Sequence, residues 1–208
     1  MSRSAQRLIL CGLYLCCALF TALPGEAFAQ TVGTPLPLGP EVVEIEGYGF
    51  PPRIAGLARS TKTDFGSPDL GFSVRYGTSR DTWADIYVYD DPRVLSAGSL
   101  SLATREVDEA IEGVKALVDQ GLYQRAAVRS RSTSGPFAAA HLTIVQGGRE
   151  RESFVFVTTH NRRFIKIRLT APPGNGAHAL ARRFVEEYGR TLNAASARPG
   201  RPASPAPH

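Results

Sequence analysis

"SFVFV", Ser153 to Val157, carries apolar side chains at alternating positions on both sides of an extended chain. In a strand, Phe154 and Phe156 would point to one face of the sheet, and Val155 and Val157 to the other. A strand that is apolar on both faces needs cover on both faces. The stretch therefore predicts a sheet with a packed layer on each side, and not an open sheet with one face in water.

Further strands are expected on both sides of this stretch, because apolar and polar residues alternate there with a period of two. Gly147-Gly148 is typical of a hairpin turn, and His160-Asn161-Arg162 predicts another. Such short connections favour antiparallel pairing. The expected strands are residues 42–48, 54–65, 71–76, 83–89, 124–131, 138–146, 152–159 and 163–170.

Two segments have the apolar period of an amphipathic helix. The segment "TREVDEAIEGVKALVDQG", residues 104–121, has one apolar stripe and ends at Gly121. A second helix is expected to begin at an Asn175 cap and to run to Leu192. Together with the strands, these segments predict an α+β fold, in which a mostly antiparallel sheet is sandwiched by two amphipathic helices.

Residues 1–29 are expected to form a cleaved secretory signal peptide. Two arginines lie within the first seven residues, an apolar run covers 8–23, and Ala27-Phe28-Ala29 has the small-x-small pattern that precedes cleavage. The run is shorter than the roughly 20 residues that a membrane-spanning helix needs. We therefore expect cleavage between Ala29 and Gln30, no stable membrane anchor afterwards, and a periplasmic or secreted protein.

The rest of the chain is expected to form one domain. Residues 30–41 are rich in Pro and Gly and predict a flexible linker, 42–192 the single α+β domain, and 193–208 a disordered Ala/Pro/Arg tail. All three cysteines precede residue 18, so the mature domain has neither a disulfide nor a thiol nucleophile. The net charge of +5 does not indicate a nucleic-acid partner. We expect a monomer.

The stretch "WADIYVYDDP", Trp83 to Pro92, contains three aspartates and could be read as a metal site. A calcium loop would need acidic residues that alternate through a Gly-hinged turn, and that spacing is missing. Asp90-Asp91-Pro92 is instead typical of a strand end, because proline cannot donate a ladder hydrogen bond and aspartate favours turns. We therefore predict a turn here and no metal site.

The aromatic residues of the same stretch leave two interpretations open. Trp83 and Tyr87 would share one side of a strand, and Lys166 and Arg168 would share one side of "RFIKIRLT", residues 163–170. These four residues could line a groove that binds a sugar, a peptide or a protein partner. They could equally form cross-strand aromatic and cation pairs beneath a helix. The sequence does not say whether the two sides coincide.

No cofactor motif is complete. Gly174-x-Gly176-x-x-Ala179 matches the letters of a dinucleotide fingerprint, but no strand with an acidic residue follows it. We therefore expect no cofactor. An enzyme assembled from dispersed residues is the alternative: a periplasmic hydrolase or metal-dependent enzyme that uses His141, His160 and Asp85. That alternative requires Asp85 and a histidine to meet in one pocket.

The order of elements resembles the PsbP-like α/β sandwich, a fold that also occurs in many uncharacterised exported bacterial proteins. The features that carry the resemblance are a strand ending in "VYD", an amphipathic helix, a meander ending in "RFIKIRLT", and a closing helix "RRFVEEYGRTL", within residues 54–192. Known members are assembly or binding accessories, to a photosystem or to a small GTPase. The resemblance thus implies a non-enzymatic binding or assembly accessory domain, and it transfers no site residue.

Overall fold

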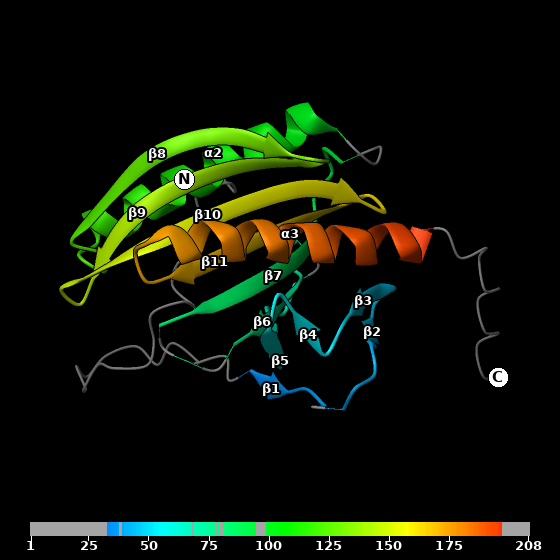
Figure 1. Ribbon diagram of the computed structural model, residues 1–208. Helices are drawn as coiled ribbons and strands as arrows, with labels where there is room; N and C mark the ends of the chain where they lie inside the picture. Colours follow the sequence, from blue (N-terminus) through cyan, green and yellow to red (C-terminus); the bar gives the residue numbers. More distant parts are fainter. Residues whose placement is uncertain are drawn as a thin grey trace, which may run out of the picture.

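The computed structural model describes residues 33–37, 39–67, 69–77, 79, 81–94 and 99–196. The predicted signal peptide with its cleavage site, and the tail from residue 197 onward, lie outside the described residues. Figure 1 shows the arrangement of the elements. In chain order they are β1 (Thr34–Pro35), β2 (Val43–Ile45), β3 (Tyr48–Phe50), β4 (Arg53–Ile54), β5 (Leu57–Asp64), β6 (Phe72–Tyr76), β7 (Trp83–Asp90), α2 (Leu100–Asp119), β8 (Arg125–Ser134), β9 (Phe137–Gln146), β10 (Arg149–His160), β11 (Arg163–Ala171) and α3 (Asn175–Ser196).

Within the described residues, nine strands form one antiparallel sheet. Eight of them follow the order β1-β5-β6-β7-β11-β10-β9-β8, and β4 pairs with β5 beside this path; β2 and β3 form a separate hairpin. The prediction of an α+β fold with a mostly antiparallel sheet and two helices is confirmed. The order also places β7 directly beside β11, so two strands that are distant in sequence become neighbours.

The two described helices lie against opposite faces of the sheet (Figure 1). Strand β10 shows why both faces need cover: Phe154 and Phe156 join the apolar core on the α3 side, and Val155 and Val157 join the core on the α2 side. Each fully buried side chain of this kind contributes about 1.5–3 kcal/mol through its removal from water. Neither helix is long and apolar enough, over the described residues, to cross a membrane.

The segment predicted as a linker, residues 30–41, contributes to the sheet. Strand β1 pairs with β5, and the buried Arg59 guanidinium donates to the carbonyl oxygens of Pro37 at 2.6 Å and Glu41 at 3.2 Å. The linker prediction is therefore wrong for the part that the structure describes. Strand β1 has only two residues, one of them Pro35, so the sequence shows no strand period there. The unpaired edge of β5 is what draws this segment into the sheet.

Several element boundaries also differ from the predictions. The segment 42–48 is not one strand, because a turn at Glu46-Gly47, with φ of 51° and 82°, separates β2 from β3. Helix α2 begins four residues earlier than expected, where the Ser99 hydroxyl accepts from the Leu102 N–H. Helix α3 continues to Ser196, beyond the predicted end of the domain at residue 192.

Candidate functional site

The four candidate binding residues lie on the same face of the sheet. The register of β7 and β11 pairs Trp83 with Thr170, Asp85 with Arg168, and Tyr87 with Lys166. Because side chains alternate along a strand, all of these point toward the α2 side. We call this set the polar strip; it consists of Trp83, Asp85, Tyr87, Lys166, Arg168 and Thr170.

The polar strip lies beside α2. Helix α2 packs against β8, β9 and β10, where the residues on this face are apolar, including Leu142, Val155 and Val157. On β7 and β11 the same face carries the polar strip, and β6 adds Arg75 opposite Asp85. One face of the sheet is therefore divided into an apolar half beneath the helix and a polar half next to it.

The rings of Trp83 and Tyr87 are not open contact surfaces, since they are only 8% and 6% exposed. Phe65 stacks on Tyr87 with ring centroids 6.2 Å apart. The Lys166 ammonium lies 5.7 Å from the Tyr87 ring centroid and 4.8 Å from that of Tyr89. For Tyr87 and Lys166, the structure thus has the cross-strand aromatic and cation pairs of the second interpretation, and the idea of an exposed aromatic groove is corrected.

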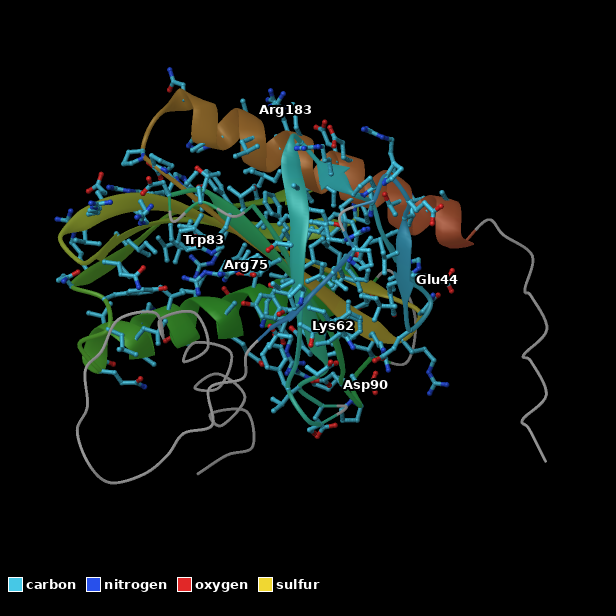
Figure 2. The ribbon with its side chains drawn as sticks, turned by 90° about the horizontal axis from the view of Figure 1, so that it is seen from below. Glu44, Lys62, Arg75, Trp83, Asp90 and Arg183 are labelled. Carbon is cyan, nitrogen blue, oxygen red and sulfur yellow. The ribbon has the colours of Figure 1, made fainter. Side chains whose placement is uncertain are left out.

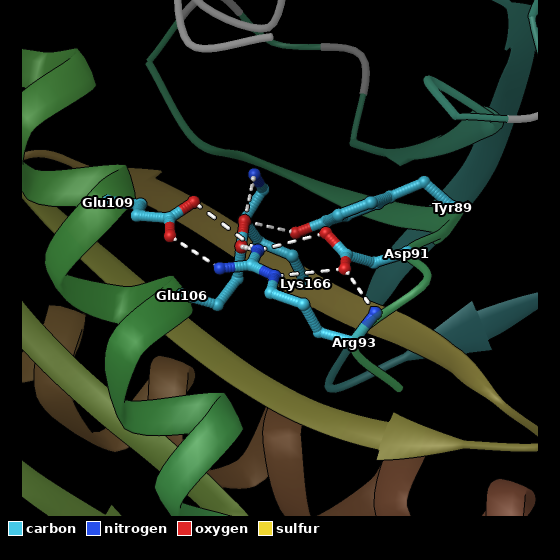
Figure 3. Close-up of polar contacts among 6 residues, drawn as sticks. All are labelled: Tyr89, Asp91, Arg93, Glu106, Glu109 and Lys166. Atoms are coloured by element: carbon cyan, nitrogen blue, oxygen red, sulfur yellow. Dashed lines mark hydrogen bonds and ion pairs between the residues drawn. The ribbon is translucent and has the colours of Figure 1, made fainter. Parts of the chain in front are cut away.

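Charged side chains at the Lys166 end of the polar strip form a network of hydrogen bonds and ion pairs (Figure 3). Tyr89 donates to Glu106, and the Lys166 Nζ lies 3.4 Å from the same carboxylate. The Arg93 guanidinium bonds to Asp91 at 2.9 Å and to Glu109 at 2.7 Å. Hydrogen bonds to Asp91, and then to Glu109, raise the pKa of Arg93 above its ordinary value. The network joins α2 to β7, β11 and the connection between β7 and α2.

Asp90 and Asp91, at the end of β7, each accept hydrogen bonds from an arginine. Strand β7 ends at Asp90, whose carboxylate accepts from Arg163 at 2.6 Å. Asp91 accepts from the backbone N–H of Arg93 at 2.8 Å, which is a local Asx-type turn contact. The predicted turn is present, and the structure adds that both carboxylates hold arginines. No group of three or more His, Cys, Asp or Glu within the described residues could hold a metal ion.

At the other end of the strip, two arginines flank the Trp83 ring. The guanidinium carbons of Arg75 and Arg151 lie 5.9 Å and 5.6 Å from the ring centroid. Figure 2 labels Trp83 and Arg75, which lie next to each other. Both arginines are neutralised: Arg75 bonds Asp85 through two contacts, at 2.8 Å and 3.0 Å, and Arg151 contacts the Asp81 carboxylate at 3.2 Å.

Arg168 is held differently. It is 8% exposed and donates to the Tyr123 hydroxyl at 3.0 Å and, at a long 3.4 Å, to Ser153. Within the described part of the chain, Arg168 forms no ion pair with any carboxylate, and the Trp83 Nε1 and the Thr170 hydroxyl are buried without a hydrogen-bond partner. We call Trp83, Ser153, Arg168 and Thr170 the Trp83 cluster.

The dispersed catalytic residues do not meet. Asp85 lies on the α2 face, whereas His141 lies on the α3 face, stacked on Phe154 at 4.6 Å and 4.5 Å from the ring of His178. His160 lies six positions along β10 from Phe154, the register partner of His141, a span of about 20 Å. The alternative that needed Asp85 and a histidine in one pocket is therefore wrong for these residues.

Sequence reasoning missed three members of this region. Arg75, Arg151 and Tyr123 come from β6, β10 and the segment after α2, so their proximity to Trp83 and Arg168 depends on strand order. One signal was available: in "GFSVRY", Arg75 alternates with the apolar Val74 and Tyr76, which places it on the side opposite the core.

No protein-family model matches the chain, and no curated protein matches it. Among solved structures, the chain is similar to the solution structure of cyanobacterial PsbP (CyanoP) from Synechocystis sp. PCC 6803. The TM-score is 0.35 and the sequence identity 12%, over 83% of this chain and 96% of that chain. The similarity concerns the coarse fold, so ligand and function are argued below from the residues of this chain.

Proposed function

We propose that the protein is an exported, non-enzymatic binding or assembly accessory that holds a ligand at the Trp83 cluster. The observation that carries the proposal is a pair of unsatisfied buried polar atoms, the Trp83 Nε1 and the Thr170 hydroxyl, whose residues are register partners on β7 and β11. A buried polar group without a partner costs about 1–3 kcal/mol. A bound molecule that offers a hydrogen bond to each would remove that cost.

The chemistry of the cluster supports binding and not catalysis. Its polar atoms are an indole N–H, a guanidinium and two hydroxyls, and none of the cluster's members is a general base that could activate Ser153 or Thr170. His141, which could serve as a base, lies on the opposite face of the sheet. The arrangement can therefore orient a ligand through hydrogen bonds, but it lacks the paired groups of a hydrolase.

The position of the cluster supports a small ligand. The Trp83 ring retains 8% of its exposure, and the side chain of its neighbour Arg75 is 40% exposed, so this end of the polar strip reaches solvent. The Lys166 end is closed by its own carboxylate network.

Native mass spectrometry of the mature protein, purified gently from its own cell envelope, tests the proposal. We expect a chain that begins at Gln30 and carries the added mass of a small molecule. Thr170→Val, which removes the unsatisfied hydroxyl, should reduce the loaded fraction, whereas Thr104→Val on the exposed side of α2 should not. A bare mass together with the absence of any specific cross-linked protein in cells would overturn the proposal.

A further inference from the structure

We infer that the ligand of the Trp83 cluster carries an oxyanion, a carboxylate or a phosphate group, which Arg168 binds. This inference rests on the proposed function and adds the chemical class of the ligand. Arg168 is a permanent cation that is almost completely buried, and it forms no ion pair with any described carboxylate. The charge of Asp85, directly opposite across the strand pair, offsets part of the cost of burying this cation. No described carboxylate bonds to the guanidinium, however, so it provides a site for an anion.

The neighbouring cations show that this is a particular property of Arg168. Four other described cations on or beside the polar strip contact a carboxylate: Arg75 contacts Asp85, Arg151 contacts Asp81, Lys166 contacts Glu106, and Arg93 contacts Asp91. The buried Arg59 also lacks a carboxylate, but it donates to the carbonyl oxygens of Phe50, Pro37 and Glu41. Among the described residues, Arg168 donates to two hydroxyls, and its guanidinium carbon lies 5.9 Å from the Tyr123 ring centroid.

The carboxylate opposite Arg168 in the register bonds to another arginine. Asp85 lies directly opposite Arg168 across β7 and β11. Both carboxylate oxygens of Asp85 already accept from Arg75, one from Nε and the other from Nη2. The Arg168 guanidinium is instead directed to Tyr123 and Ser153, whose hydroxyls carry no charge.

The other unpaired atoms of the cluster match an oxyanion. The Trp83 indole can only donate, the Arg168 guanidinium can only donate, and the Thr170 hydroxyl can do so as well. Carboxylate and phosphate oxygens only accept, and their hydrogen bonds to a guanidinium are among the strong ones in proteins. A cationic ligand would instead be placed next to the like charges of Arg75, Arg151 and Arg168.

Trp83 allows a direct test, because it is the only tryptophan in the chain. Its fluorescence is recorded while the mature protein is titrated with inorganic phosphate and, separately, with acetate, each against sodium chloride at equal ionic strength. We expect a saturable change with phosphate or with acetate, and none with chloride. The anion that produces the change distinguishes a phosphate from a carboxylate ligand, whereas no change with either anion would overturn the inference.

Two substitutions locate the response. Arg168→Gln should weaken anion binding about tenfold or more, because a charge-assisted contact is lost. The matched control, Arg183→Gln on the exposed side of α3, should leave the affinity unchanged. Equal losses in both variants would indicate a general charge effect and would overturn the inference.

Thr170→Val keeps the test valid if Arg168→Gln does not fold. Valine has nearly the shape of threonine, and the replaced hydroxyl has no partner within the described residues. We expect about fivefold weaker anion binding with no loss of thermal stability. An unchanged affinity in Thr170→Val would overturn the assigned geometry. If mass spectrometry finds a ligand without a carboxylate or phosphate, the proposed function stands and this inference fails.

Discussion

Asp85→Asn tests whether the charges of the polar strip contribute to folding as the contacts indicate. The Asp85 side chain is 5% exposed and accepts two hydrogen bonds from Arg75, at 2.8 Å and 3.0 Å. Asparagine keeps the volume of aspartate, but it has one acceptor oxygen and no charge. The substitution therefore removes the ion pair without creating a cavity.

The expected loss in the free energy of unfolding follows from how exposed Asp85 and Arg75 are. Removing one partner of a buried ion pair costs about 3–5 kcal/mol, whereas exposed pairs contribute about 0–1 kcal/mol. Asp85 is buried, but the Arg75 side chain is 40% exposed and can regain water when released. We therefore expect the free energy of unfolding to fall by about 2 kcal/mol. For a chain of this size, that corresponds to a decrease in Tm of about 4–8 °C.

Urea unfolding followed by circular dichroism provides the measurement, and Asp64→Asn provides the control. Asp64 is also ion-paired, to Lys62 at 2.6 Å, but it is 60% exposed, so its loss should cost about 0.5 kcal/mol or less. The charge of Asp85 also stabilises Arg168 across the strand pair. Added phosphate should therefore stabilise Asp85→Asn more than the unsubstituted protein. If both variants unfold within about 0.5 kcal/mol of the unsubstituted protein, the reasoning about buried charge is refuted.

Three other substitutions test separate features. Gly71→Ala should prevent folding or cost about 3 kcal/mol or more in urea unfolding, because Gly71 has a φ of +63° and a Cβ there would lie 1.8 Å from the Val88 carbonyl oxygen. Arg162→Gly should raise the free energy of unfolding by about 1 kcal/mol, since Arg162 occupies the left-handed region with a φ of 64°; an unchanged value would contradict this. Burial lowers the pKa of His160, so its contribution to stability is present above about pH 6.5 and is lost as the pH falls through the folded-state pKa. His160→Gln should accordingly reduce the loss of stability between pH 7 and pH 5, and an identical pH profile would count against the assignment.

The predictable part of the fold is the part specified by local periodicity. The alternation in "SFVFV" identified a strand with two apolar faces, and Phe154 and Val155 indeed belong to different cores. Helices α2 and α3 were recognised from their apolar stripes, although not their first or last turns. The turn at Glu46-Gly47 could have been predicted as well, because glycine at the second position is typical of a two-residue hairpin.

The candidate site could be predicted only in part, because its geometry depends on register. The sequence identified Trp83 and Arg168 as members of one-sided patterns. Their strands, β7 and β11, are neighbours in the sheet although α2, β8, β9 and β10 lie between them in the sequence. No local pattern encodes that Asp85 accepts its hydrogen bonds from Arg75 and not from Arg168. The unsatisfied Thr170 hydroxyl is likewise a property of the assembled sheet.

Stability alone does not account for the composition of the Trp83 cluster. Its neighbours on β9 and β10 show that this face accepts aliphatic residues, since Leu142 and Val155 are 1% exposed and lie in the core beneath α2. Replacing buried charged groups by well-packed apolar residues is often neutral or stabilising. An aliphatic residue at position 168, beside Val155, would continue that core across β11. Among the described residues, Arg168 has no carboxylate partner, and the nearby indole N–H and Thr170 hydroxyl have no hydrogen-bond partner, so in the isolated chain this arrangement is less stable than an aliphatic core would be. A bound oxyanion would stabilise it.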